Sequence, residues 1–253
     1  MLPVEIVTIS DSHKLHVIDI VAIDSAMARL LDTSLVSICE GASDTELYIV
    51  KLKLKAFLDT KDLNTRMGAI AELLAHFYLR GCGYKQEFLF SNLEEGSIKK
   101  GFDGYFSKDD QSFIVESKSG QISTSGMSHR AKLQESYNDI KKYVSGKSDK
   151  SNNNPWRNAY NHACHLDVNT EKTSIIKQIK EISDLFDCGI FKKISEFNII
   201  PCSTVYMNDN WSPIPSSTIL QDNSFLNKFE GKTINSICIT KCSVQQFLNY
   251  LVK

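Results

Sequence analysis

Phe113-Ile114-Val115-Glu116-Ser117-Lys118 is the most informative segment of this chain, because it has the apolar composition of a strand and ends in charged residues. It is preceded by Gly101-Phe102-Asp103-Gly104-Tyr105-Phe106 and a polar segment, 107–111, with the composition of a turn, so the two apolar segments predict a β-hairpin. Alternate residues of a strand share a face. Glu116 and Lys118 therefore project together, and pairing of the strands brings Asp103 to the same end of the sheet.

Two carboxylates and an ammonium group then converge where an apolar strand would otherwise carry no charge. Mg²⁺ binds one or two carboxylates and completes its shell with water and substrate phosphate. A neighbouring lysine can hold the attacking water or the phosphate. Glu72 is a third candidate carboxylate. It lies on a predicted helix over 64–80, on the face opposite the apolar stripe, where its neighbours include small residues. The alternatives are a surface ion pair for Glu116 and Lys118, a turn residue at Asp103 and a solvated carboxylate at Glu72.

The order of these residues resembles the PD-(D/E)xK nuclease superfamily, in which a glutamate helix precedes the catalytic strand pair. The resemblance implies that Glu72, Asp103 and Glu116 bind Mg²⁺ or Mn²⁺ and that Lys118 assists the water. Phe102 stands where the superfamily has proline. Some members carry a Gln-x-x-x-Tyr helix after the lysine; Gln134 and Tyr137 are one residue too close for it, and Gln134 is kept as a candidate for positioning substrate.

A narrower resemblance covers residues 46–144. This part of the chain is similar to the nuclease subunit of Hachiman anti-phage defence systems. The similarity lies in the order of its segments: Lys51-Leu52-Lys53-Leu54-Lys55, then Arg66-Met67-Gly68 and the glutamate helix, then the hairpin. This resemblance implies DNA as substrate, little sequence preference and a helicase partner that restrains the nuclease. A type II restriction endonuclease and a non-catalytic module that binds DNA or a partner protein remain open.

Basic residues cluster around the predicted site. Between residues 99 and 150 there are ten Lys and Arg against seven Asp and Glu, whereas the whole chain has a net charge of -1. This distribution excludes a strongly basic nucleic-acid-binding protein and predicts a modest local surface for a polyanion. The candidates for substrate binding are Lys100, Arg130 and Lys132, besides Gln134.

The remaining sequence predicts a single α/β domain over all 253 residues, with a restriction-endonuclease-like core at 46–144, a mobile loop at 145–154 and a C-terminal elaboration of helices and strands at 155–253. We expect a central mixed sheet flanked by helices. In the N-terminal part we predict a hairpin of 4–9 and 15–20, a helix over 21–38 and a strand over 46–58 with an outer row of lysines. In the middle we predict strands near 84–90, 101–106 and 112–119, a flexible loop at 119–128 and a helix over 128–144. In the C-terminal part we predict a short helix after Pro155, a helix over 171–187, a strand over 197–207 interrupted by Pro201, a strand at 233–240 and a helix capped by Ser243.

Several function classes are excluded. No apolar run reaches the ~18 residues that span a bilayer, and the first residues have no signal-peptide order, so we expect a cytoplasmic protein. The seven scattered cysteines predict reduced thiols without a disulfide framework. No Walker motif is present, which predicts no nucleotide cofactor and places any motor on another polypeptide. His162 and His165 lack a second ligand pair at zinc-finger spacing.

Overall fold

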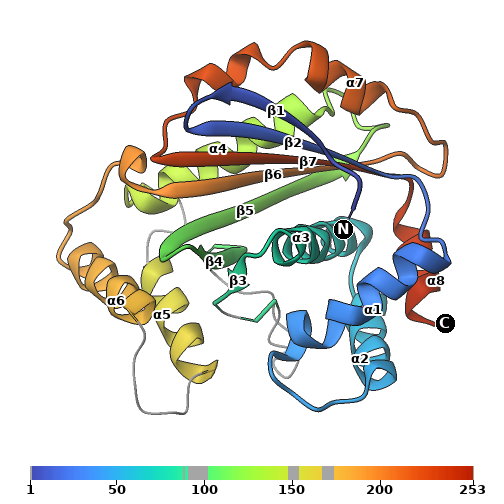
Figure 1. Ribbon diagram of the computed structural model, residues 1–253, viewed down its shortest axis with the longest axis horizontal. Helices are drawn as coiled ribbons and strands as arrows, with labels where there is room; N and C mark the ends of the chain where they lie inside the picture. Colours follow the sequence, from blue (N-terminus) through green and yellow to red (C-terminus); the bar gives the residue numbers. More distant parts are fainter. Residues whose placement is uncertain (1, 88, 91–101, 148–153, 167–173, 253) are drawn as a thin grey trace.

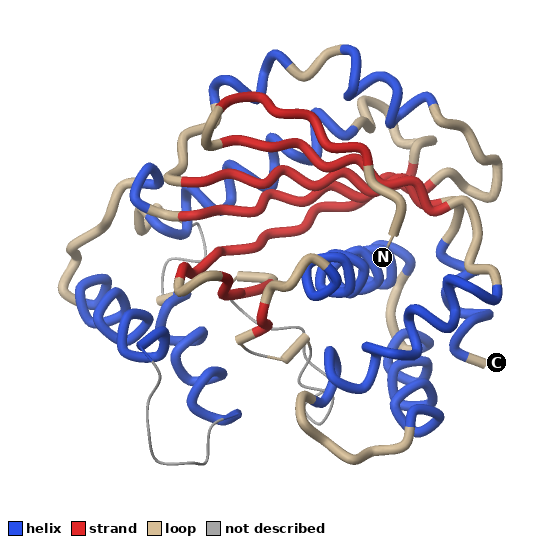
Figure 2. Tube along the Cα trace, viewed as in Figure 1, coloured by secondary structure: helices blue, strands red, loops and turns tan. Residues whose placement is uncertain are grey.

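The computed structural model describes residues 2–87, 89–90, 102–147, 154–166 and 174–252. At its centre lies a seven-stranded mixed sheet in the order β1-β2-β7-β6-β5-β4-β3 (Figures 1 and 2). Strands β2, β7, β6 and β5 run parallel, and β1, β4 and β3 pair antiparallel at the two edges. The bounds are β1 Glu5–Ser10, β2 His13–Ile20, β3 Lys85–Gln86, β4 Gly104–Lys108, β5 Gln111–Gln121, β6 Asn198–Tyr206 and β7 Thr233–Lys241.

Helices cover both faces of the sheet, and each face has its own apolar core (Figure 1). One core is formed with α1 Ser25–Glu40, α2 Leu47–Asp59, α3 Leu63–Gly81 and α8 Val244–Leu251. The other is formed with α4 His129–Val144, α5 Pro155–Leu166, α6 Ser174–Asp187 and α7 Ile214–Gln221, together with the short 3₁₀ helices η1 Ile194–Glu196 and η2 Ser224–Lys228. Parallel strands buried on both faces explain the continuous apolar runs of β6 and β7. The predicted α/β class and central mixed sheet are confirmed.

The two predicted hairpins are present. β1 and β2 pair antiparallel, as do β4 and β5. In the second hairpin Asp109 and Asp110 form the turn with φ of 50° and 57°, the left-handed conformation that a tight two-residue hairpin turn requires. The predicted helix at 64–80 is α3, which is buried along most of its length from Met67 to Leu79, so its small-residue face permits the expected close approach of other elements.

The predicted strand over 46–58 is wrong, because this segment is helix α2. Val50, Leu54 and Leu58 are buried, whereas Leu52 is 60% exposed. A spacing of four residues satisfies both the strand period of two and the helix period of 3.6, so alternation alone misled the prediction. Leu, Lys and Ala favour helix over strand.

The expected outer row of lysines is also wrong. Lys51 is buried, 2.8 Å from Asp32, with its ammonium over the ring of Tyr250. The next two lysines of the row pair with Glu40 and Asp59. The pairs with Asp32 and Glu40 join α2 to α1, whereas the pair with Asp59 lies within α2.

Three other elements differ from prediction. Pro201 does not interrupt β6, which runs through it without a break. The hydrogen-bonded ladder with β7 omits Ile200 and Pro201, because proline has no N–H to donate. The strand expected at 84–90 is reduced to β3. β5 continues through Gln121 into the segment expected to be a loop.

The N-cap of α8 is Ser243, as predicted. Most of the expected mobile loop, residues 148–153, lies outside the described residues. Within the described part of the chain, no helix is long and apolar enough to cross a membrane.

Candidate active site

The site is built on the β4–β5 hairpin. Asp103 immediately precedes β4, and Gly104 pairs with Val115 of β5. This register brings the Asp103 carboxylate to β5, where the backbone N–H of Ser117 donates to its Oδ2 at 2.7 Å. Because Ser117 lies between Glu116 and Lys118, the structure brings together the three side chains that the sequence singled out.

Glu116 is almost completely buried, with 2% of its surface exposed. Its Oε1 accepts from Lys118 Nζ at 2.8 Å, whereas no described residue hydrogen-bonds its Oε2. Burial raises the pKa of Glu116 well above its usual value, and the negative charge of Asp103 adds to the shift. A buried carboxylate oxygen without a donor, next to a second carboxylate, is an arrangement that a cation would relieve.

Lys118 lies between two carboxylates. Its Nζ is 2.8 Å from Glu116 Oε1 and 2.8 Å from Oδ2 of Asp139, on α4. Burial alone would lower the pKa of Lys118, but the neighbouring carboxylates outweigh burial and raise it. The ammonium is therefore held charged beside Glu116.

Asp139 was not identified from the sequence. Asp139 directly precedes Ile140, a buried apolar residue of α4, which places it near the buried side of that helix. Only the packing of α4 on β5 shows that Asp139 contacts Lys118. Ser136, one turn earlier, donates from its Oγ to the Glu116 carbonyl at 2.8 Å and accepts from the backbone N–H of Cys202 at 3.3 Å. These two bonds join α4 to β5 and β6 at the site.

Glu72 approaches the hairpin from α3, and both it and His76 are buried. His76 Nε2 lies 3.2 Å from the Asp103 carbonyl oxygen and 3.9 Å from Glu72 Oε1. The His76 ring packs edge-on against Phe106. A Cβ on Gly104 would lie 3.1 Å from His76 Nε2, so glycine allows this close approach.

The described residues contain no group of three or more His, Cys, Asp or Glu side chains arranged to hold a metal ion. Glu72 thus does not form a ready-made ligand triplet with Asp103 and Glu116, and its role as a metal ligand stays a prediction. The two remaining carboxylates do fit Mg²⁺ or Mn²⁺, since a magnesium ion in proteins commonly has one or two carboxylate ligands and retains several waters.

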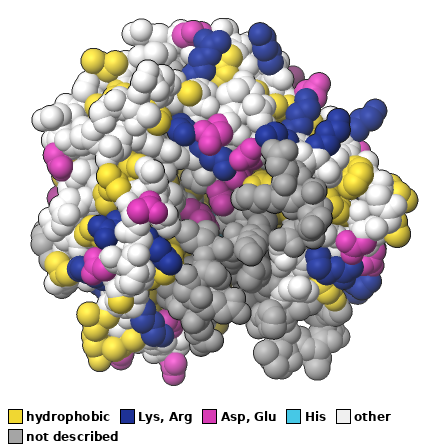
Figure 3. Space-filling view, turned by 180° about the vertical axis from the view of Figure 1, so that it is seen from behind, with side chains coloured by type: hydrophobic (Ala, Val, Ile, Leu, Met, Phe, Trp, Pro, Cys, Tyr) yellow, Lys and Arg dark blue, Asp and Glu magenta, His cyan; other side chains and the backbone are white. Residues whose placement is uncertain are grey.

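The predicted substrate-binding residues are distributed around α4. Arg130 lies 3.3 Å from Asp222, and Lys132 lies 2.7 Å from Glu135. Gln134 donates to Asn138, one turn along the same helix, and Lys100 lies outside the described residues. Figure 3 shows that Lys and Arg side chains on this side of the molecule lie beside Asp and Glu side chains, so local ion pairs balance part of the basic charge.

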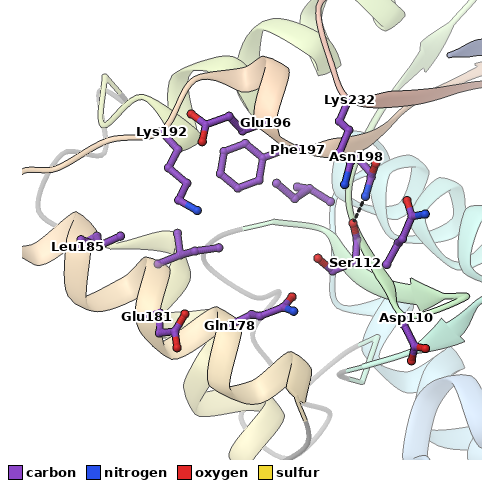
Figure 4. Close-up of a pocket in the computed structure, with 13 residues that line it drawn as sticks. Asp110, Ser112, Gln178, Glu181, Leu185, Lys192, Glu196, Phe197, Asn198 and Lys232 are labelled. Atoms are coloured by element: carbon purple, nitrogen blue, oxygen red, sulfur yellow. Dashed lines mark hydrogen bonds between the residues drawn. The ribbon is translucent and has the colours of Figure 1, made fainter.

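A cavity of about 270 Å³ lies elsewhere, at the beginnings of β5 and β6 beside α6 (Figure 4). Its wall includes Asn198, whose Nδ2 donates to the Ser112 carbonyl, and the side chains of Lys192 and Lys232. It contains none of Asp103, Glu116 and Lys118, and is therefore distinct from the hairpin site.

The central mixed sheet flanked by helices agrees with a restriction-endonuclease-like α/β fold, and its β4–β5 hairpin brings Asp103, Glu116 and Lys118 together. A family model described as HamA matches residues 3–251, and the chain belongs to the HamA family. It is accordingly a component of Hachiman anti-phage defence, a multi-protein system. No curated protein and no solved structure matches the chain.

Proposed function

We propose that this chain is a metal-dependent nuclease that hydrolyses phosphodiester bonds of DNA through a PD-(D/E)xK-type site, as the effector of its defence system. The observation that carries this proposal is the Ser117 N–H bond to Asp103 Oδ2 at 2.7 Å, because it gathers Asp103, Glu116 and Lys118 at one point of the sheet. A surface ion pair would not need a carboxylate that is 2% exposed.

Asp103 and the free Oε2 of Glu116 are the proposed ligands of Mg²⁺ or Mn²⁺, with Glu72 as a further, outer candidate. When bound, such an ion lowers the pKa of a water ligand and polarises the phosphoryl oxygens. Lys118, held charged by two carboxylates at 2.8 Å, orients the water or offsets negative charge on the phosphate. Ser117 N–H fixes the Asp103 carboxylate, and Ser136 fixes the backbone of Glu116.

DNA is the proposed substrate and a helicase the proposed partner. Arg130 and Lys132 form ion pairs in which at least one side chain is exposed. An exposed ion pair contributes only about 0–1 kcal/mol to stability. DNA phosphate groups can therefore replace the acidic partners of these residues at little cost in free energy. A partner that supplies most of the DNA affinity agrees with the near-neutral chain.

The test is cleavage of supercoiled plasmid by the full chain, alone and with its partner, in Mg²⁺ or Mn²⁺. We expect nicking that EDTA abolishes, and a loss of about 100-fold or more in Glu116→Gln and Lys118→Met. Glu181→Gln and Lys180→Met, at exposed positions of α6 outside the basic cluster at 99–150, are the matched controls and should cleave normally.

Wild-type rates in Glu116→Gln, or cleavage that EDTA does not affect, would refute the proposal. Binding of labelled duplex without turnover in any divalent metal would favour the non-catalytic module. A discrete digest pattern would favour a restriction endonuclease.

A further inference from the structure

We propose that Asp139 is a positioning residue of this site, which holds the Lys118 ammonium in place while Glu116 engages the metal. The inference rests on the proposed nuclease function. It adds a carboxylate from α4 to a site whose other residues come from the hairpin and α3.

The geometry places Lys118 between two unequal partners. Glu116 and Asp139 are each 2.8 Å from Nζ, but the side chain of Glu116 is 2% exposed and that of Asp139 is 28% exposed. Glu116 also has the only buried carboxylate oxygen of this pair without a hydrogen bond from the described residues. Glu116 is therefore suited to a metal ion, and Asp139 to the lysine.

A cation bound to Glu116 would neutralise part of the carboxylate charge that attracts Lys118. With Glu116 as its sole partner, the lysine side chain would gain rotamer freedom, since a long side chain of this type loses conformational entropy when it is fixed. Asp139 keeps one strong, charge-assisted contact on the ammonium, and the third N–H of Lys118 is left for water or phosphate.

The position of Asp139 is itself fixed. One turn before it, Ser136 bonds to the Glu116 carbonyl and to the Cys202 N–H. At the start of α4, His129 is buried and bonds through both ring nitrogens, at 2.9 Å to Ser203 Oγ and 3.0 Å to Thr240 Oγ1. Helix α4 is thus joined to β5, β6 and β7, and the distance from Asp139 to Lys118 does not depend on an exposed loop.

The alternative is an ordinary, partly exposed ion pair without effect on the reaction. Kinetics of the full chain, in the complex in which the wild type cleaves, separate the two. Asp139→Asn should lower kcat by about 10- to 100-fold, the range expected when a catalytic group is displaced by up to 1 Å, and leave KM within about twofold. Asp139→Glu should recover a substantial part of kcat.

Asp59→Asn is the matched control, because Asp59 forms an exposed Lys–Asp pair with Lys55 on α2, and it should change neither constant. If Asp139→Asn does not fold, as judged by its melting transition, Asp139→Ser and Asp139→Glu are assessed by the same criteria.

A kcat within twofold of wild type in Asp139→Asn, or no recovery in Asp139→Glu, overturns the inference while leaving the proposed function intact. Absence of metal-dependent cleavage by the wild type overturns both.

Discussion

Replacing Glu116 with glutamine should make the metal-free protein more stable. Glu116 is buried, its pKa is raised by burial, and its Oε2 has no donor among the described residues. Glutamine has nearly the same shape, carries no charge and can still accept from Lys118. Lys118 keeps Asp139 at 2.8 Å, so the substitution does not leave a buried charge without a counter-ion.

The size of the effect follows from these contacts. Replacing a buried ion pair by apolar residues of similar volume is often neutral or stabilising by about 1–4 kcal/mol, whereas removing one partner costs about 3–5 kcal/mol when the other charge is left unpaired. Because one ion pair of Lys118 remains, we expect about 1–2 kcal/mol in the free energy of unfolding. For a chain of this size that corresponds to a rise of about 2–4 °C in Tm.

The assay is thermal unfolding of wild type, Glu116→Gln and the exposed control Glu135→Gln in EDTA. The control should melt within about 1 °C of wild type. A Tm of Glu116→Gln below that of wild type would show that Glu116 stabilises the fold as an ordinary structural residue, and would refute the reasoning that its burial is a cost retained for function.

Other substitutions test the packing around the site and the corrected helix. Gly104→Ala should lower the free energy of unfolding by about 1–3 kcal/mol, because its Cβ would lie within 3.2 Å of three side chains. Gly68→Ala has no atom within 4 Å of its Cβ and should raise the free energy of unfolding by about 0.5–1 kcal/mol. Urea unfolding measures both. Burial lowers the pKa of His129 to about 3, so the unfolded chain takes up this proton at a higher pH than the folded chain. The free energy of unfolding should therefore fall as pH drops below 6.5, by about 3 kcal/mol at pH 4. His129→Gln should flatten this pH dependence, and an unchanged dependence would contradict the prediction. Leu54→Ala should cost about 2–5 kcal/mol and Leu52→Ala less than ~0.5 kcal/mol, since Leu54 is 1% and Leu52 60% exposed; equal losses would favour a strand.

The parts of the structure that the sequence predicted are those whose signals are local. The β4–β5 hairpin follows from apolar segments around a polar turn, and α3 from apolar residues at helical spacing. Asp103, Glu116 and Lys118 could be grouped because one hairpin carries all three, so that short-range pairing alone brings them together.

The features that depend on tertiary packing could not be predicted in this way. The partner of Lys118 on α4 is set by the crossover that lays this helix over β5, and no residue spacing reports it. The strand predicted at 46–58 failed because its apolar spacing fits two periods, and the burial of Lys51 against Asp32 is visible only once α1 and α2 pack. The basic surface around Arg130 was predicted without the acidic side chains that lie beside it.

We propose that Asp103 and Glu116 bind one divalent ion next to Lys118. A crystal structure of the full chain soaked in Mn²⁺, recorded at a wavelength where manganese scatters anomalously, would locate that ion. We expect an anomalous peak about 2.0–2.2 Å from a carboxylate oxygen of both residues, and loss of that peak in Glu116→Gln. A peak elsewhere, or none at a saturating concentration of Mn²⁺, would contradict it.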